Sequence, residues 1–158
     1  GWHVQVLTRP NVIAALGPAL ADLAAPLVVD HFGLPDLAGG PEQPGFAALA
    51  ALLRTGRVAV KLSAIERLTG RGEGARIIPF IHALVAANPR ALVWGSDWPH
   101  TGGGRGQGRG KGRGAADIEP FEPLEDADAL SVLAKAVPDD DNLADILVNT
   151  PARLYDFA

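Results

Sequence analysis

Four apolar, β-branched runs are spaced along the chain, and each is followed by a loop and a helix-like stretch. The runs are Trp2–Leu7, Leu27–His31, Val58–Ser63 and Leu92–Asp97. Helical patterns follow at Asn11–Leu23, Phe46–Leu53, Ala75–Ala87, Asp126–Val137 and Asn142–Val148. Strands that alternate with helices predict βαβ units and an α/β fold. The near-continuous apolar strands predict a parallel sheet that is buried on both faces.

One segment, residues 101–114, breaks this pattern. It reads TGGGRGQGRGKGRG and contains no apolar residue. Because it cannot bury surface to offset the entropy lost on ordering, we expect a flexible Gly/Arg-rich insertion. Arg-Gly repeats also occur in RNA-binding segments, which leaves nucleic-acid binding as an alternative. The tract has no aromatic residues and the whole chain has a net charge of −4, and both weigh against that alternative.

Composition narrows the class of protein. The 158 residues are about one domain's worth, so we expect a single domain over residues 1–158. The absence of cysteine excludes disulfides and thiolate metal sites. No apolar run is long enough to span a bilayer, which predicts a cytoplasmic protein without a membrane partner.

Polar side chains lie towards the ends of all four predicted strands. They are His3 and Gln5, then His31, then Lys61 and Ser63, and finally Asp97, which directly precedes Trp-Pro-His. In parallel α/β sheets, functional residues gather at the carboxyl ends of strands. Burying these groups together is costly unless they serve a site, so the pattern indicates a hydrolase or lyase centre.

Residues near these candidates are expected to have different roles. Strand alternation places His31 on the face of Leu27 and Val29, and it points Asp30 the other way, towards the helices, as a structural residue. His100 follows the fourth strand and is expected to line the mouth of the site. His82 falls within a predicted helix and is expected to be an ordinary surface or packing residue.

Five motifs occur in a characteristic order: GWHVQV, VVDHFGLP, VKLSA, VWGSDWPH and ILVNTPARLYDF. Together they resemble the amidohydrolase-related family, and WHVQ with WGSDWPH is most similar to its 2-pyrone-4,6-dicarboxylate lactonase branch. The resemblance implies the carboxyl-terminal half, strands five to eight, of a TIM-like (β/α)8 barrel of the metal-dependent-hydrolase type. The family's His-x-His of the first strand is absent from this chain.

The resemblance also implies a site. His31 and Asp97 are the catalytic residues, and they would be the ligands if a divalent zinc or manganese ion is bound. Arg67 would hold a substrate carboxylate, and Glu66 stands where a tyrosine is common. The other residues expected to bind a small carboxylated substrate are His3, Gln5, Lys61, Ser63 and His100.

The implied reaction is the opening of a carboxylated lactone by water. Asp97 would take the proton from water, and His31 would stabilise the charge that develops on the carbonyl oxygen. A decarboxylase of the same superfamily and a non-catalytic remnant remain as alternatives. Half a barrel cannot close on itself, so its open edges also predict self-association.

Overall fold

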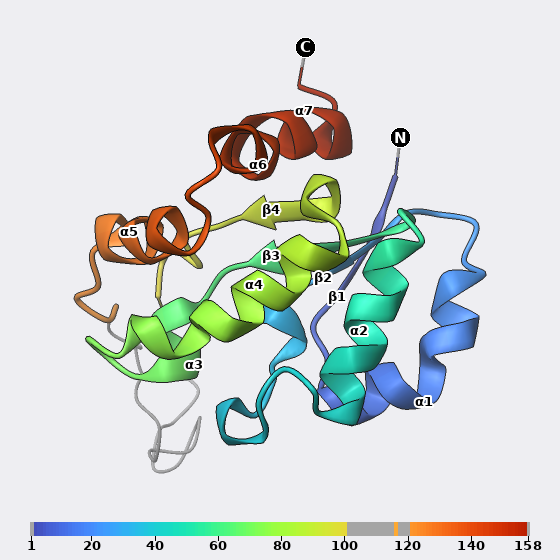
Figure 1. Ribbon diagram of the computed structural model, residues 1–158, viewed down its shortest axis with the longest axis horizontal. Coiled ribbons are helices and arrows are strands. Elements are labelled where there is room, and N and C mark those ends of the chain that lie inside the picture. Colours follow the sequence, from blue (N-terminus) through green and yellow to red (C-terminus); the bar gives the residue numbers. More distant parts are fainter. Residues whose placement is uncertain (1, 101–115, 117–120, 158) are drawn as a thin grey trace.

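A parallel sheet forms the centre of the computed structural model, which describes residues 2–100, 116 and 121–157. Its strands are β1 (Val4–Val6), β2 (Leu27–Val29), β3 (Val58–Leu62) and β4 (Leu92–Trp94). They pair in the order β1-β2-β3-β4, and all three pairings are parallel (Figure 1). The predicted α/β class and strand order are therefore confirmed, although the strands end earlier than the apolar pattern suggested.

Helices connect the strands and cover one face of the sheet (Figure 1). They are α1 (Pro10–Ala21), α2 (Pro44–Arg54), α3 (Ile65–Thr69), α4 (Ile78–Ala87), α5 (Asp126–Ala136), α6 (Asp140–Ala144) and α7 (Thr150–Tyr155). A π-helical turn, Asp145–Asn149, joins α6 to α7, and short 3-10 turns lie at His31–Gly33, Leu37–Gly39, Gly74–Ile77 and Pro89–Ala91.

The predicted helix at Asn142–Val148 is therefore wrong in its bounds. The backbone N–H of Asn142 donates to the Asp139 side chain, which caps a helix that begins earlier, at Asp140. The sequence pattern also missed α3 and α7, because helices this short do not complete a recognisable apolar period.

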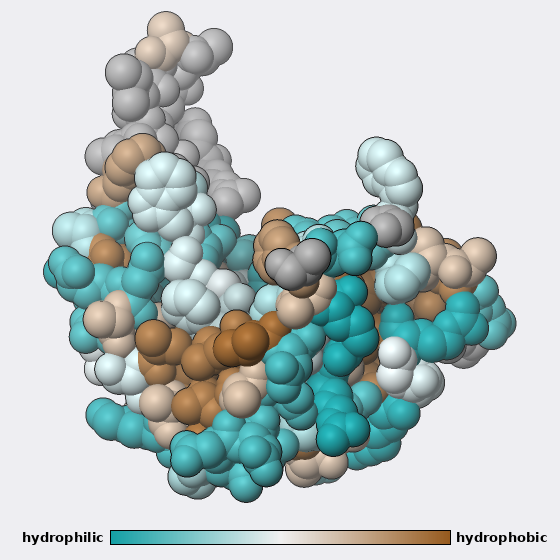
Figure 2. Space-filling view, turned by 90° about the horizontal axis from the view of Figure 1, so that it is seen from above, coloured by the Kyte–Doolittle hydropathy of each residue, from teal (hydrophilic) through white to brown (hydrophobic). Residues whose placement is uncertain are grey.

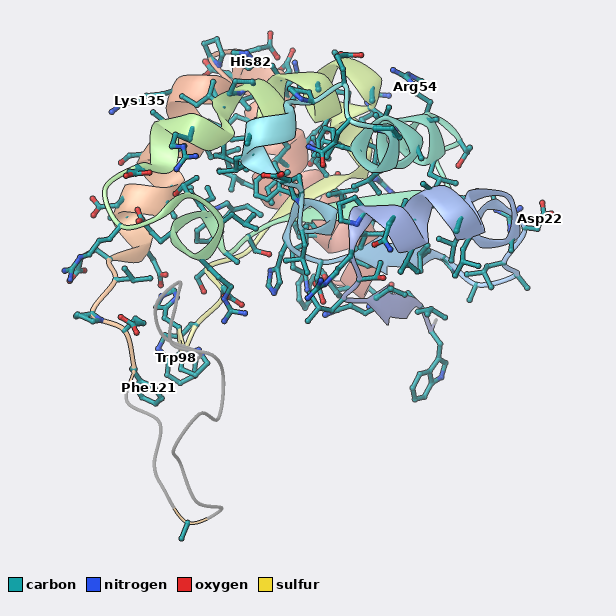
Figure 3. All side chains as sticks on the ribbon, turned by 90° about the horizontal axis from the view of Figure 1, so that it is seen from below. Asp22, Arg54, His82, Trp98, Phe121 and Lys135 are labelled. Atoms are coloured by element: carbon teal, nitrogen blue, oxygen red, sulfur yellow. The ribbon has the colours of Figure 1, made fainter. Side chains whose placement is uncertain are left out.

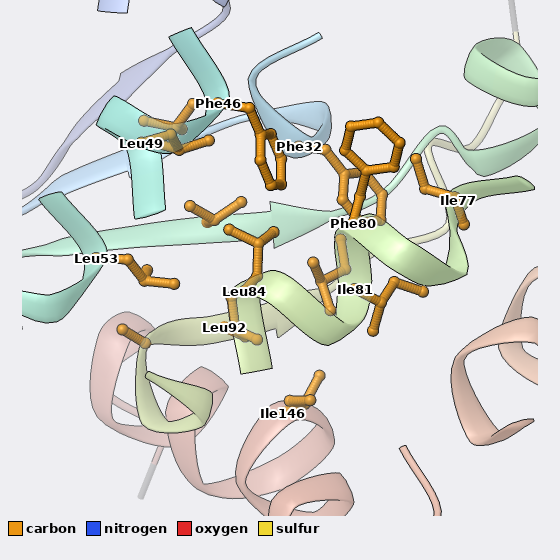
Figure 4. Packing of buried hydrophobic residues seen from close by; sticks show 14 of the residues in the cluster. Phe32, Phe46, Leu49, Leu53, Ile77, Phe80, Ile81, Leu84, Leu92 and Ile146 are labelled. Atoms are coloured by element: carbon orange, nitrogen blue, oxygen red, sulfur yellow. The ribbon is translucent and has the colours of Figure 1, made fainter. Parts of the chain in front are cut away.

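The hydrophobic core lies between the sheet and its helices (Figure 4). Leu27 and Val29 of β2 belong to the same buried cluster as Phe46 of α2 and Phe80 of α4. The rings of Phe46 and Phe80 meet edge to face, with centroids 5.0 Å apart. Alternate residues of the strands therefore face the helices and anchor the sheet.

The opposite face of the sheet is defined by the strand register. Gln5 pairs with Val28, Val28 pairs with Ala59, and Lys61 pairs with Val93, so these residues share that face. Gln5 is exposed, whereas Val28 is buried. The expected burial of both faces is thus wrong for β1, because β1 is an end strand of the sheet.

Two helices approach each other unusually closely where α1 begins. A Cβ atom added to Gly45 would lie 2.3 Å from Pro10 Cβ and 2.4 Å from the Pro10 backbone. Only glycine leaves room for the start of α1 to rest on the start of α2. This contact fixes the segment that follows β1.

The structure does not test two of the sequence predictions. The Gly/Arg-rich tract at 101–114 lies outside the described residues, so the predicted insertion and the single-domain division remain predictions. Among the helices that the structure describes, none combines the length and apolar character needed to cross a membrane.

Candidate functional site

Asp97 lies between two basic side chains just beyond the end of β4. Its Oδ2 is 3.2 Å from Arg67 Nη2, and its Oδ1 is 3.5 Å from His31 Nε2. His31 follows β2 and Arg67 lies in α3, so three βα connections contribute to one cluster. The structure therefore brings together His31, Arg67 and Asp97, as the sequence predicted.

Ser63 supports His31 from the other side of the imidazole ring. Its Oγ is 2.8 Å from His31 Nδ1, and Ser63 is only 1% exposed. Ser63, His31 and Asp97 are the residue types of a hydrolytic triad. A hydroxyl this deeply buried cannot reach a substrate carbonyl, so Ser63 orients the ring and is not a nucleophile.

A second charged group lies on the face of the sheet opposite the helices. Asp30 Oδ1 is 3.0 Å from Lys61 Nζ, and Gln5 Nε2 donates to Asp30 Oδ2 at 3.0 Å. The three residues come from β1, from the end of β2 and from β3. Asp30 is therefore not directed at the helices, so its predicted orientation was wrong, while its ranking as a structural residue stays a prediction.

The register of β2 explains this correction. Val28 pairs with Gln5, and Asp30 lies two residues after Val28, so both point to the face that carries Lys61. Leu27 and Val29 point into the helical core instead. The orientation of Asp30 follows from the pairing of Gln5 with Val28, which the sequence alone does not show.

His31 reaches the site because the backbone leaves the strand conformation. His31 has a φ of 52° and Asp97 has a φ of 67°, which is the left-handed region. Ala64, directly after Ser63, also has a positive φ, of 60°. Non-glycine residues in this region cost about 1–3 kcal/mol each and tend to cluster at functional sites. Simple strand alternation therefore could not place His31.

The environment of His31 favours its neutral form. Burial lowers the pKa of the His31 imidazole below its ordinary value of 6.5, and this effect outweighs the opposing pull of Asp97 and Asp30. The positive charges of Arg67 and Lys61 lower the pKa further. A neutral imidazole near Asp97 can donate or accept a hydrogen bond, depending on which nitrogen carries the proton.

His3 lies away from the other predicted substrate-binding residues, whereas the backbone N–H of His100 donates to the carbonyl oxygen of Asp97 at 3.0 Å. His3 lies near the amino ends of the strands, where its ring meets Tyr155 edge to face. It lines a cavity of about 350 Å³ with Arg57, Arg90 and Arg153, at the end of the sheet opposite Asp97. His100 Nε2 lies 3.0 Å from Asp126 Oδ1, at the start of α5.

Trp98 and Phe121 lie on one side of the molecule, and the outer helices lie on the other (Figure 3). Trp98 follows Asp97 directly, and its ring lies 6.1 Å from that of Phe121. Figure 3 shows this pair at one side, and it shows His82 and Lys135 on the outer helices at the other. His82 is exposed on α4, as expected for a surface residue.

The described residues do not complete a metal centre. Among them, no group of three or more His, Asp or Glu side chains is arranged to hold an ion. His31 and Asp97 would supply two ligands, which is fewer than a catalytic zinc site normally uses. Zinc or manganese binding therefore does not fit these residues alone.

Comparison with known proteins identifies relatives of the whole chain. A family model described as amidohydrolase matches residues 1–157. The 4-sulfomuconolactone hydrolase of Rhizobium radiobacter is 32% identical over 155 residues, which are 98% of this chain and 47% of that protein. The chain thus spans about half the length of the curated relatives that it matches.

Solved structures give the same picture of the fold. A candidate 2-pyrone-4,6-dicarboxylic acid hydrolase from Pseudomonas putida is 32% identical, with a TM-score of 0.75, and the match covers 99% of this chain and 52% of that one. An amidohydrolase from Burkholderia multivorans with bound zinc is 22% identical, with a TM-score of 0.71, over 98% of this chain and 52% of that one. The sheet and helices described above thus correspond to about half of a barrel of this type.

Proposed function

Because this chain belongs to the amidohydrolase family, we propose that it forms part of a hydrolase that opens a carboxylated lactone by attack of water. The observation that carries this proposal is the position of Asp97 between His31 and Arg67 at the carboxyl end of the sheet. Relatives that match the chain are lactone hydrolases, and they supply the reaction class.

Asp97 is the base in the proposed reaction. Its carboxylate accepts a proton from water while the water oxygen bonds to the lactone carbonyl carbon. Arg67 and His31 approach different oxygens of Asp97, so the carboxylate is held in one orientation. Holding a base in place removes part of the entropic cost of reaching the transition state.

His31 stabilises the negative charge that develops on the carbonyl oxygen. The separation of 3.5 Å between His31 Nε2 and Asp97 Oδ1 is longer than an ordinary N–H···O hydrogen bond, so Nε2 is not tightly committed to Asp97. Ser63 holds the ring through Nδ1. A hydrogen bond from Nε2–H to the carbonyl oxygen would strengthen as charge accumulates there.

Ring opening follows when the carbon–oxygen bond of the lactone breaks. The former carbonyl carbon becomes a carboxylic acid, which releases its proton to solvent as it ionises, and the departing ring oxygen takes the proton that Asp97 received from water. Arg67 holds an acid group of the substrate, since a guanidinium matches carboxylate geometry with paired donors. None of these proposed reaction steps uses a metal ion.

The direct test is hydrolysis of 2-pyrone-4,6-dicarboxylate, followed by the loss of ring absorbance. It is run with this chain alone and with this chain mixed with the amino-terminal half of the Rhizobium radiobacter relative. Asp97→Asn should lower turnover by at least about 100-fold. The matched control is Asp22→Asn, because Asp22 is exposed and lies beyond α1.

Three results would contradict the proposal. An absence of turnover both with the chain alone and with the mixture would favour a non-catalytic remnant, and release of carbon dioxide would favour a decarboxylase. Equal turnover by Asp97→Asn and wild type would remove Asp97 as the base.

We also propose that the chain associates with itself through the open edges of its sheet. β1 and β4 are the end strands of the described sheet, and each pairs on one side only. Leu7, which directly follows β1, and Leu16 of α1 are exposed apolar side chains. Figure 2 also shows apolar residues gathered in the middle of one face. These features support self-association through the edges, which light scattering on the purified chain would detect. A cytoplasmic location remains a prediction from the sequence.

A further inference from the structure

The amino ends of the strands border a cavity that the proposed reaction does not use. The cavity has a volume of about 350 Å³ and lies at the end of the sheet opposite Asp97. Residues at or just before the starts of the strands line it, together with residues of α7, which lies beside the amino end of β1 (Figure 1). The edge-to-face contact between His3 and Tyr155 joins these two parts of the wall. A cavity of this volume falls within the range of small-molecule sites in proteins.

Positive charges outnumber negative charges in the lining of this cavity. Arg57, Arg90 and Arg153 contribute guanidinium groups, and among the described lining residues Asp156 alone contributes a carboxylate. The whole chain has a net charge of −4, so three arginines around one cavity reverse the charge balance locally. A cavity lined mainly by one sign of charge concentrates ions of the opposite sign.

Two of these arginines have no carboxylate partner within the described part of the chain. Nη2 of Arg57 donates to the carbonyl oxygen of Leu23, and Nη2 of Arg153 donates to the carbonyl oxygen of Arg90. Both acceptors are neutral, and neither arginine forms an ion pair with a described residue. Arg90 differs, because its Nε lies 3.4 Å from Asp145 Oδ2. A guanidinium has five N–H donors, so these contacts leave donors of Arg57 and Arg153 for a ligand.

The same hydrogen bonds hold the two arginines in place. Arg57 directly precedes β3, and its bond to Leu23 ties it to the loop before β2. The Arg90 carbonyl oxygen accepts from Arg153 and also from Thr150 Oγ1, which donates at 3.0 Å. Thr150 is 2% exposed, so this anchor of α7 is shielded from water. Side chains that are already positioned lose less conformational entropy when a ligand binds.

We propose that this cavity binds a small organic oxyanion, whose phosphate or carboxylate group is held by Arg57 and Arg153. Guanidinium groups bind both kinds of head group through paired N–H donors. Pro26, Ala59 and Leu154 also line the cavity, and they offer apolar contacts to the carbon atoms of such a ligand. The cavity lies at the other end of the sheet from Asp97, so this inference does not depend on the proposed function.

Calorimetry on the intact chain at low ionic strength tests the binding. Glycerol 3-phosphate and glycerate differ in their head group, and inorganic phosphate lacks the organic part. At least one of the two organic anions should bind, with an affinity about fivefold or more above that of inorganic phosphate. A preference for glycerol 3-phosphate assigns the site to a phosphate ester, and a preference for glycerate assigns it to a carboxylate.

Substitutions locate the binding at the arginines. Arg57→Gln and Arg153→Gln should each weaken the binding of the preferred anion by about tenfold or more, because an ionic hydrogen bond is lost. Arg54→Gln is the matched control, since Arg54 is exposed on α2 and does not line the cavity.

Asp156→Asn gives a second test, which removes no hydrogen bond donor from the cavity. Asp156 has a φ of 59°, in the left-handed region that asparagine tolerates, so the fold should be kept. Loss of this negative charge should tighten the binding of the anion by about threefold or more. Asp22→Asn makes the same charge change at an exposed position outside the cavity and should leave the affinity unchanged.

Nuclear magnetic resonance of the histidine rings gives an independent readout. The preferred anion should shift the ring signals of His3, which lines the cavity, and leave those of His82, which is exposed on α4. His3→Gln and His82→Gln assign the two sets of signals.

Three results would overturn the inference. They are the absence of binding by all three anions, binding that survives both Arg57→Gln and Arg153→Gln, and binding that shifts His82 but not His3. Binding that survives both substitutions would place the anion elsewhere, such as on the arginine-rich residues 101–114. Equal affinities for inorganic phosphate and the organic anions would overturn the assignment to an organic ligand. None of these results bears on Asp97, so the proposed function is tested separately.

Discussion

Asp30 and Lys61 form an ion pair of 3.0 Å between the end of β2 and the penultimate residue of β3, on the face of the sheet away from the helices. Both side chains are mostly buried, and Gln5 joins them from β1. The pair therefore links three strands at the rim where the proposed chemistry takes place. It has consequences for stability.

Replacing Asp30 with alanine should destabilise the fold. Lys61 and Gln5 would lose a shared partner in a partly buried position, and the expected cost is about 1–3 kcal/mol of unfolding free energy. Urea unfolding followed by circular dichroism measures this change. Glu73→Ala, which removes an exposed partner of Arg76, should change the unfolding free energy much less. Equal effects of the two substitutions would contradict the structural importance of Asp30.

The lowered pKa of His31 predicts how stability depends on pH. In the unfolded chain His31 titrates near 6.5, whereas burial keeps it neutral to a lower pH in the folded state. As the pH falls below 6.5, the unfolded state takes up the proton first, so the unfolding free energy decreases. Denaturant midpoints measured between about pH 5 and pH 8 should show this loss.

Variants isolate the contribution of His31 to that profile. His31→Gln should reduce the slope below pH 6.5, because it removes the titrating group. His82→Gln changes an exposed histidine of α4 and should leave the slope nearly as it is. A profile that is steeper in His31→Gln than in wild type would reverse the predicted sign.

Gly45→Ala should disturb the contact between α1 and α2. The new methyl group would overlap the backbone of Pro10, which cannot move aside as a flexible side chain could. Overpacking of this kind costs about 1–3 kcal/mol or more. Thermal unfolding would measure the loss, and Ala47→Gly, at an exposed position of the same helix, would give only the change in helix propensity. A wild-type stability for Gly45→Ala would show that the helices can separate without cost.

Arg67→Gln should lower kcat/KM for a carboxylated lactone by about 10- to 100-fold, because an ionic hydrogen bond to the substrate is lost. The same change at Arg54, which is exposed on α2, should have little effect. Steady-state kinetics in the mixture that shows turnover would compare the two variants. A larger effect from Arg54 than from Arg67 would contradict the assignment of Arg67 to the substrate carboxylate.

Much of the fold follows directly from apolar spacing. Leu27, Val58 and Leu92 begin strands where the sequence predicts them, because runs of branched apolar residues fit a buried parallel sheet. The ends of the strands were less predictable. His31 and Asp97 lie in left-handed backbone beyond the regular strand, and no alternating pattern describes such residues.

The residues that make up the site were only partly predictable from the sequence. His31, Arg67 and Asp97 were expected together and do lie together. Asp30 was misplaced because its orientation depends on register with β1, which apolar spacing within β2 does not reveal. His3 was grouped with the others, although it lies at the amino end of its strand.

The adjacency of Asp30 and His31 constrains how this rim can diverge. Asp30 pairs with Lys61, and the next residue, His31, lies beside Asp97. A single residue inserted or deleted at this junction would therefore displace both side chains at once. Changes that tune anion recognition without disturbing hydrolysis are therefore expected at Gln5 or Lys61, on the neighbouring strands, and not at the end of β2.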